Sequence, residues 1–173
     1  MMNLPQVIII SGTPGVGKTT VCKILSKKGF TTFNLNDFII QKGLYFGYDF
    51  SLESVIIDDN IMQEKLKEEF LKYSKTVFIE GHTAELVPKV YVILAFVLRC
   101  NPSILRKRLE ESRNYSKSKI KENVEAEIMD ECYLNVKDSF IGISIIEIDT
   151  SFITPEDVAN QIINFTNASL QMF

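Results

Sequence analysis

Cysteine is scarce in this 173-residue sequence, and the three that occur, Cys22, Cys100 and Cys132, are scattered. They are odd in number and lack the paired spacing of a disulfide framework or a zinc site. Free thiols persist mainly in reducing compartments. We therefore expect a cytoplasmic protein, with a nuclear location also open if the source is eukaryotic.

The sequence also lacks any apolar run that approaches the length of a membrane span. Its N-terminal apolar stretch is short and has no basic leader, which predicts a buried strand and not a signal peptide. The formal net charge of -3 argues against a protein whose main role is non-specific nucleic-acid binding. We expect neither a membrane nor a nucleic acid as a direct partner.

No linker, internal repeat or low-complexity tract divides the chain. With 46% apolar residues, a chain of this length can bury about 70% of its unfolded surface. The composition therefore predicts one domain that spans residues 1–173.

One motif is complete: residues 12–19 read Gly-Thr-Pro-Gly-Val-Gly-Lys-Thr and fit the phosphate-binding loop pattern G-x-x-x-x-G-K-[ST]. The apolar run 7–10 precedes it, and apolar residues at helical spacing follow it. Glycines let backbone amides surround phosphates, Lys18 adds a compact positive charge, and the Thr19 hydroxyl can ligate Mg2+. A chance match in a glycine-containing turn is the alternative, but the strand-loop-helix order favours nucleotide binding.

Strand and helix patterns alternate along the chain, which is typical of a parallel sheet covered on both faces. The predicted fold is a three-layer α/β P-loop nucleoside monophosphate kinase fold with a five-stranded parallel sheet. Its strands are predicted at residues 7–10, 32–35, 76–79, 91–98 and 143–148.

The pattern weakens over residues 34–57, which we interpret as a small mobile insertion with no core element. An amphipathic helix follows at residues 58–73. After a polar break at residues 112–118, Ile120, Val124, Ile128 and Cys132 repeat every four residues and predict one long helix with a buried stripe.

A second chemical site is predicted at Glu80-Gly81-His82, where a buried strand ends. An acid at this end of a strand beside a phosphate loop can hold Mg2+ or orient the attacking group, so we expect Thr19 and Glu80 to be metal ligands. His82 is the only histidine, and its neutral ring could accept a hydrogen bond from water or substrate. A purely structural histidine is the alternative.

All four arginines, Arg99, Arg106, Arg108 and Arg113, fall within one fifteen-residue stretch. Because the guanidinium group suits phosphate oxygens, the cluster indicates anion contact from one side. We expect Arg106 to be solvated and Arg113, next to the polar break, to contact phosphate.

Several segments together resemble the adenylate kinase isoenzyme six family, adenylate-kinase-like NTPases with coilin-interacting and ribosome-maturation members. The resemblance covers nearly the whole chain and rests on residues 12–20, 34–37, 43–49, 80–82, 97–100, 113–115 and 119–128. It implies a monophosphate-binding segment at residues 34–57 and a short lid at residues 112–122. It also implies ATP contacts by Gly15, Gly17, Lys18, Thr19, Thr20 and the lid arginine Arg113.

Two positions depart from the family pattern. Glu80 stands where the family often has aspartate, and residues 34–57 contain no arginine and only one lysine, Lys42. The acceptor phosphate is then bound weakly or draws on Arg99 or Arg108 from the core.

The leading hypothesis is an adenylate kinase that converts ATP and AMP to two ADP, with slower ATPase activity. Lys18 and Mg2+ would neutralise the phosphates, Arg113 would close on the developing charge, and Glu80 and His82 would organise metal, water or acceptor. One alternative is an ATPase that acts in small-ribosomal-subunit maturation by binding a ribosomal protein or pre-ribosome. A kinase for another small metabolite is the third hypothesis.

Overall fold

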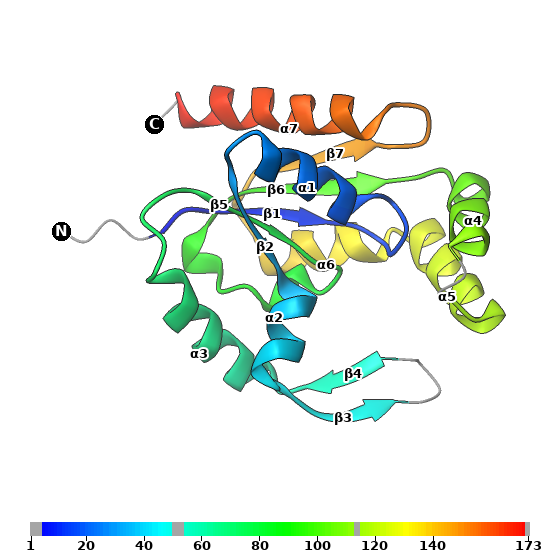
Figure 1. The fold of residues 1–173 in the computed structure, drawn as a ribbon, viewed down its shortest axis with the longest axis horizontal. Helices are drawn as coiled ribbons and strands as arrows, with labels where there is room; N and C mark the ends of the chain where they lie inside the picture. The colour runs from blue at the N-terminus through cyan, green and yellow to red at the C-terminus, as the bar shows by residue number, and fades with distance from the viewer. Residues whose placement is uncertain (1–4, 50–53, 113–114, 172–173) are drawn as a thin grey trace.

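The computed structural model describes residues 5–49, 54–112 and 115–171, and within them a parallel sheet lies between two layers of helices (Figure 1). The strand order in this sheet is β2-β5-β1-β6-β7. The five strands are β1 (Val7–Ser11), β2 (Thr31–Asn34), β5 (Val77–Glu80), β6 (Val92–Arg99) and β7 (Ile145–Asp149). The predicted three-layer α/β fold and all five predicted strands are confirmed.

The sheet carries a hydrophobic core on each face because side chains alternate along a strand. In β1, Ile8 and Ile10 belong to one buried cluster, whereas Val7 and Ile9 belong to the other. All four side chains are fully buried. This explains why the central strands are apolar without interruption, as expected for a parallel sheet covered on both sides.

The helices form three groups around the sheet (Figure 1). One face carries α1 (Lys18–Lys27) and α7 (Pro155–Leu170), and the other carries α2 (Leu35–Lys42), α3 (Asp59–Phe70) and α6 (Glu131–Ser139). Two further helices, α4 (Pro102–Glu111) and α5 (Lys117–Ile128), stand beyond the carboxyl ends of the strands. Short 3-10 turns occur at Ala84–Leu86 and Lys89–Tyr91.

The helix starts follow the capping rules in the sequence. Asn101 accepts a hydrogen bond from the Ser103 amide before Pro102 opens α4, and Thr154 forms a capping box with Asp157 at α7. Asp58 caps α3, whose Met62, Leu66 and Phe70 are fully buried. The predicted amphipathic helix after residue 58 is therefore confirmed.

The expectation that residues 34–57 hold no core element is wrong. Asn34 caps α2, whose Leu35, Phe38 and Ile39 pack into the core. The helix ends at Gly43, which has a left-handed backbone. A separate antiparallel hairpin follows, formed by β3 (Tyr45–Asp49) and β4 (Ser54–Ile57). The i, i+3, i+4 spacing in α2 is a helix signal, but it covers only two turns.

The predicted long helix after residue 118 is also wrong in part, because the chain breaks it into α5 and α6. Asp130 has a left-handed φ of 57°, which no continuous helix allows. Ile120 and Val124 are buried as expected, but Ile128 is 59% exposed and Cys132 lies in α6. The four-residue repeat therefore crosses two helices by coincidence.

Within the described residues, no helix has the length and apolar character needed to cross a membrane. All three cysteines are free thiols, as predicted.

Candidate functional site

The phosphate loop joins β1 to α1 at the carboxyl edge of the sheet. Gly12, Gly15 and Gly17 have φ values of 142°, 94° and 107°, a region that favours glycine. At Gly12 a side chain is also excluded by space, because a Cβ atom would lie 2.4 Å from the Leu98 carbonyl oxygen. The backbone conformation thus needs the glycines of the motif, and Gly17 is the N-cap of α1.

Lys18 lies against the loop that precedes it. Its ammonium group donates to the carbonyl oxygens of Gly12 at 2.5 Å and Thr13 at 3.1 Å. Burial lowers the pKa of Lys18, while the nearby acids Glu80 and Glu127 act in the opposite direction. The Lys18 ammonium is therefore a poorly hydrated positive charge held against the phosphate loop. Such a charge would strongly stabilise an anion bound beside it.

Glu80 connects three segments at the end of β5. One carboxylate oxygen accepts a hydrogen bond from the Thr19 hydroxyl at 2.9 Å, and the other accepts from the Asn34 amide at 2.9 Å. The side chain is only 4% exposed. Thr19 and Glu80 thus present adjacent oxygen atoms, the donor type that Mg2+ prefers.

His82 lies two residues beyond the end of β5, on the wall of a cleft. Its Nδ1 atom is 3.5 Å from the Asn36 amide nitrogen. Neighbouring Gly81 is buried, and a Cβ atom there would lie 3.0 Å from Leu35 of α2. Close packing against α2 therefore disfavours any side chain at this position.

The imidazole of His82 is accessible from the cleft, although protein atoms surround most of it. Loss of hydration, followed by the charges of Lys18 and Lys119, lowers the pKa of His82 from 6.5 to about 4. The ring is therefore neutral throughout the physiological pH range. A neutral imidazole can accept a hydrogen bond as well as donate one.

A pH dependence of stability follows from this pKa. Because the folded-state pKa is depressed, the unfolded chain binds more protons between pH 6.5 and 4, and His82 lowers the stability as the pH falls through this window. We expect His82→Asn to lose less free energy of unfolding than the wild type between pH 7 and pH 4.5. Since the ring is partly solvated, the difference should be small but measurable by urea denaturation. Equal losses would show that the pKa is not depressed.

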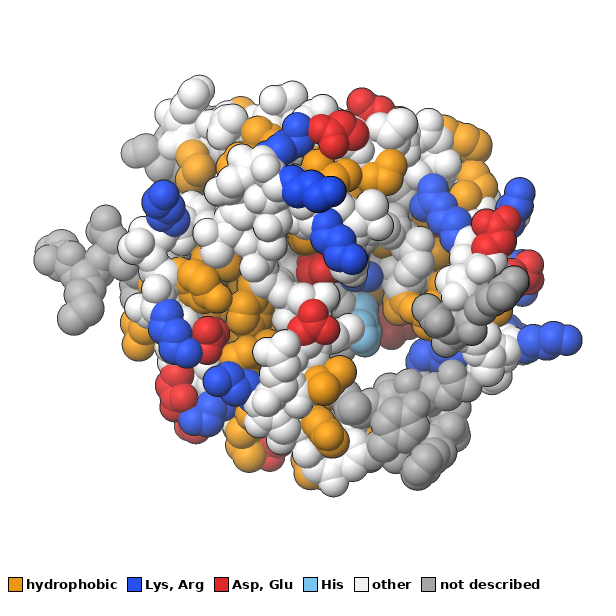
Figure 2. Space-filling view, viewed as in Figure 1, with side chains coloured by type: hydrophobic (Ala, Val, Ile, Leu, Met, Phe, Trp, Pro, Cys, Tyr) orange, Lys and Arg blue, Asp and Glu red, His pale blue; other side chains and the backbone are white. Residues whose placement is uncertain are grey.

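A cleft of about 940 Å3 brings these groups together. Lys18, Thr19, Glu80 and His82 line one part, and residues of α2 and α5 line the others. Figure 2 shows the face hollowed at this point, with the histidine visible in the hollow. A smaller cavity of about 280 Å3 adjoins the outer side of the phosphate loop and includes Gly15, Gly17 and Thr20 in its lining.

The arginines have different environments. Arg99 does not face the cleft, because its guanidinium group pairs with Glu127, Asp130 and Glu147. This contradicts the suggestion that Arg99 holds the acceptor phosphate. Arg108 donates to Thr150 and lines both cavities.

The two remaining arginines were predicted to differ. Arg106 is exposed, as expected for a solvated side chain. Arg113, predicted to be the lid arginine, lies outside the described residues.

Three polar residues were not predicted as site residues: Asn34 and Lys119, which line the cleft, and Glu127, which contacts Thr13 of the phosphate loop. Asn34 could have been found from its capping position, since a cap before Leu35 also places its side chain at the carboxyl end of β2. Lys119 and Glu127 belong to α5. Their place depends on how α5 packs against the loop, which no local pattern specifies.

Comparisons with known proteins agree with this architecture. A family model described as an AAA domain matches residues 8–130. A Pyrococcus furiosus protein named "Putative adenylate kinase" is 41% identical over 167 residues, which cover 96% of this chain and 87% of that protein. A Methanocaldococcus jannaschii protein of the same name is 37% identical over 157 residues, covering 90% and 83%. The crystal structure of a gluconokinase from Sinorhizobium meliloti 1021 shares the fold alone, with a TM-score of 0.57 and 13% identity over 98% of this chain and 97% of that one.

Proposed function

Because the chain belongs to the adenylate-kinase-like family of P-loop proteins, we propose that it transfers the γ-phosphoryl group of ATP to AMP and forms two molecules of ADP. One observation carries this proposal. Two cavities adjoin the phosphate loop and share Gly15, Gly17 and Thr20 in their linings, so that two ligands can meet there. An enzyme that only hydrolyses ATP needs no second ligand site of this size.

The smaller cavity suits the base and sugar of ATP. Val16, Ile153 and Val158 supply apolar surface, and Arg108 supplies a guanidinium plane beside it. Arg108 is held in place by hydrogen bonds of 2.8 and 3.2 Å to Thr150. Flat guanidinium groups stack on aromatic rings, which favours a purine in this cavity.

The larger cleft suits the acceptor. Asn34, Asn36, Ile39 and Ile57 line it, and all four belong to the segment predicted to bind a monophosphate. Asn36 offers a polar amide beside the apolar isoleucines, a combination that can recognise a base edge and cover its ring. The described basic side chains that line this cleft are Lys18, Arg108 and Lys119. The acceptor phosphate would therefore depend mainly on Lys119, while Arg113 of the predicted lid would close on the developing charge of the transferring group.

Mg2+ would be held by the Thr19 hydroxyl and, directly or through water, by Glu80, together with nucleotide phosphates. When bound, Mg2+ supplies Lewis-acid neutralisation of phosphate charge. Thr20, Gly15 and Gly17 line the smaller cavity. The backbone amides of these residues would contact the phosphates of ATP. These residues bind and orient ATP.

Catalysis by this chain would rest on positioning and charge. The Lys18 ammonium has three N–H donors, so it would keep its contacts with Gly12 and Thr13 and direct the third donor to the transferring phosphoryl group. His82, being neutral, would accept a hydrogen bond from the acceptor or from water and so orient the attacking oxygen. Without an acceptor, water would occupy the same space and attack the same phosphoryl group slowly, so we expect a slow accompanying ATPase activity.

The experiment that tests this function is a product analysis with purified protein, ATP, Mg2+ and a panel of nucleoside monophosphates. We expect slow release of free phosphate with ATP alone. Added AMP should suppress that release and yield two ADP per ATP consumed, because a bound acceptor displaces the attacking water. The proposal fails if no monophosphate changes the products.

A lysine of α5 provides a specific prediction. Lys119 is 16% exposed, pairs with Glu122 at 3.0 Å and lines the cleft, whereas Lys121 is 71% exposed and lies 3.7 Å from Glu125. We expect Lys119→Met to lower kcat/KM for AMP about 10- to 100-fold, because it removes a charge from the phosphate site. Lys121→Met is the matched control and should behave like the wild type. Equal effects of the two variants would contradict the assignment of Lys119 to the cleft.

A second candidate function is an ATPase that assists ribosome assembly, as the sequence resemblance implies. Exposed aromatic residues of the β3–β4 hairpin support it, since Tyr45 is 45% and Phe46 is 72% exposed. Exposed aromatic side chains are common anchors at protein interfaces. This function would be favoured if a small-subunit ribosomal protein stimulated phosphate release while AMP produced no excess ADP.

A further inference from the structure

Glu127 is the most deeply buried acid of the family-specific run 119–128, and neither cleft nor cavity accounts for it. It lies on α5 and is 3% exposed. A buried carboxylate is costly unless several hydrogen bonds stabilise its charge. Its partners should therefore show what it does.

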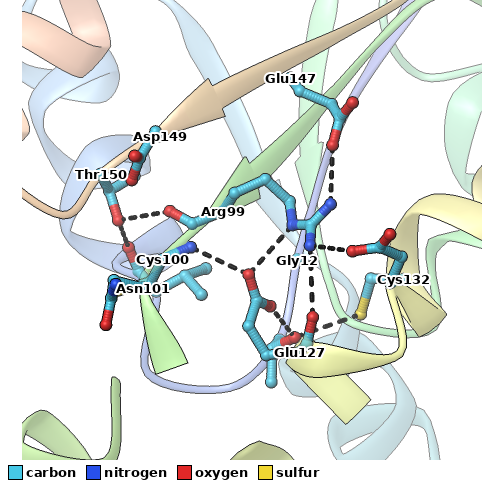
Figure 3. A network of polar contacts seen from close by, with 12 residues as sticks. Gly12, Arg99, Cys100, Asn101, Glu127, Cys132, Glu147, Asp149 and Thr150 are labelled. Carbon is cyan, nitrogen blue, oxygen red and sulfur yellow. Dashed lines mark hydrogen bonds and ion pairs between the residues drawn. The ribbon is translucent and has the colours of Figure 1, made fainter. Parts of the chain in front are cut away.

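The carboxylate of Glu127 joins the phosphate loop to the end of β6 (Figure 3). One oxygen accepts from the Thr13 hydroxyl at 2.5 Å. The other accepts from Arg99 Nε at 3.0 Å and from the Cys100 amide at 2.9 Å. Thr13 is the second residue of the phosphate-loop motif and is 1% exposed. Glu127 thus fixes a residue that belongs to the phosphate loop itself.

Thr13 is in turn connected to Lys18. The Thr13 carbonyl oxygen accepts from the Lys18 ammonium at 3.1 Å, and the adjacent Gly12 carbonyl accepts at 2.5 Å. A chain of two hydrogen bonds therefore runs from Glu127 through Thr13 to the ammonium group. Glu127 also raises the pKa of Lys18 against the lowering effect of burial, which agrees with this short path.

We propose that Glu127 is a positioning residue, which fixes Thr13 and thereby directs Lys18 towards the transferring phosphoryl group. The inference rests on the proposed phosphoryl transfer. It also gives α5 a role, because the first half of this helix belongs to the predicted lid and Glu127 in its last turn contacts the phosphate loop. A purely structural role for Glu127, as the partner of Arg99, makes different predictions.

The variants Thr13→Val and Thr13→Ser separate the two roles. Thr13→Val keeps the shape and leaves Glu127 paired with Arg99, but it removes the hydroxyl. We expect kcat to fall about 10- to 100-fold while Kd for MgATP changes less, because a misplaced group loses catalysis more than binding. Thr13→Ser restores the hydroxyl and should recover most of kcat. Thermal melting confirms that each variant is folded.

Two controls complete the set. Glu147→Gln removes another Arg99 partner, 2.7 Å from Arg99, that does not contact the phosphate loop, and kcat should stay at the wild-type value. Glu127→Gln combined with Thr13→Val should lose no more kcat than the worse single variant, because both act through one path. The proposal is overturned if Thr13→Val retains the wild-type kcat, if Thr13→Ser fails to recover it, or if the two losses multiply.

Two readouts keep this test separate from the proposed function. The ratio of the variant kcat to the wild-type kcat is measured for ADP formation from AMP and also for phosphate release from ATP alone. The test therefore does not require AMP to be the acceptor. The rate at which an amine-acylating reagent modifies Lys18 is followed by mass spectrometry without nucleotide. This rate should change in Thr13→Val and not in Thr13→Ser or Glu147→Gln. An unchanged rate in Thr13→Val would overturn the positioning role even if the wild type lacked kinase activity.

Discussion

Lys18→Ala should reduce turnover of ATP by about 10²- to 10³-fold or more, because it removes a cation aimed at developing negative charge in a poorly hydrated site. The fold should remain intact. Burial lowers the pKa of Lys18, so its charged form is disfavoured in the folded protein without ligand. The melting temperature should therefore stay the same or rise. Steady-state phosphate and ADP release, with thermal melting in parallel, measures both effects.

Lys23→Ala is the control for this variant, since Lys23 lies on the same helix and is exposed. It should match the wild type in rate and stability. Wild-type turnover in Lys18→Ala would show that the phosphate loop is not the reaction site.

Glu80→Gln should lower turnover about 10- to 100-fold and raise the Mg2+ concentration needed for half-maximal rate. Glutamine keeps the size and can still accept from Asn34 while its amide donates to Thr19, so the local hydrogen bonds at 2.9 Å survive. The variant therefore isolates the lost charge. The measurement is the ATP turnover rate of the variant and the wild type as a function of Mg2+ concentration.

Glu156→Gln removes an exposed acid that pairs with Lys28, and it should leave the Mg2+ dependence unchanged. If Glu80→Gln gave the same Mg2+ dependence as Glu156→Gln, Glu80 would have no part in holding the metal.

The sheet could be predicted from the sequence because its signals are local. The strands are short apolar runs, and the phosphate loop defines the order of strand, loop and helix around it. Glu80 could be placed beside the loop because the carboxyl ends of parallel strands meet at one edge. The register confirms this, since Ile10 and Asn34 both pair with Glu80.

What the sequence could not predict depends on tertiary packing. Leu35, Phe38 and Ile39 make α2 a core helix, but two turns of apolar spacing are a weak signal. The break at Asp130 interrupts a repeat that continues by chance in α6. Glu127 meets Thr13 across 114 positions of the sequence and Arg99 across 28, so no spacing rule identifies either contact.

The transfer of the γ-phosphoryl group from ATP to AMP, which we propose for this chain, can be followed with a labelled phosphate. The most direct measurement follows ATP labelled with phosphorus-32 at the γ position, incubated with Mg2+ and a range of AMP concentrations. We predict that the label appears in the β-phosphate of newly formed ADP, and that Lys18→Ala forms none. Label found only in free phosphate at every AMP concentration would contradict the account.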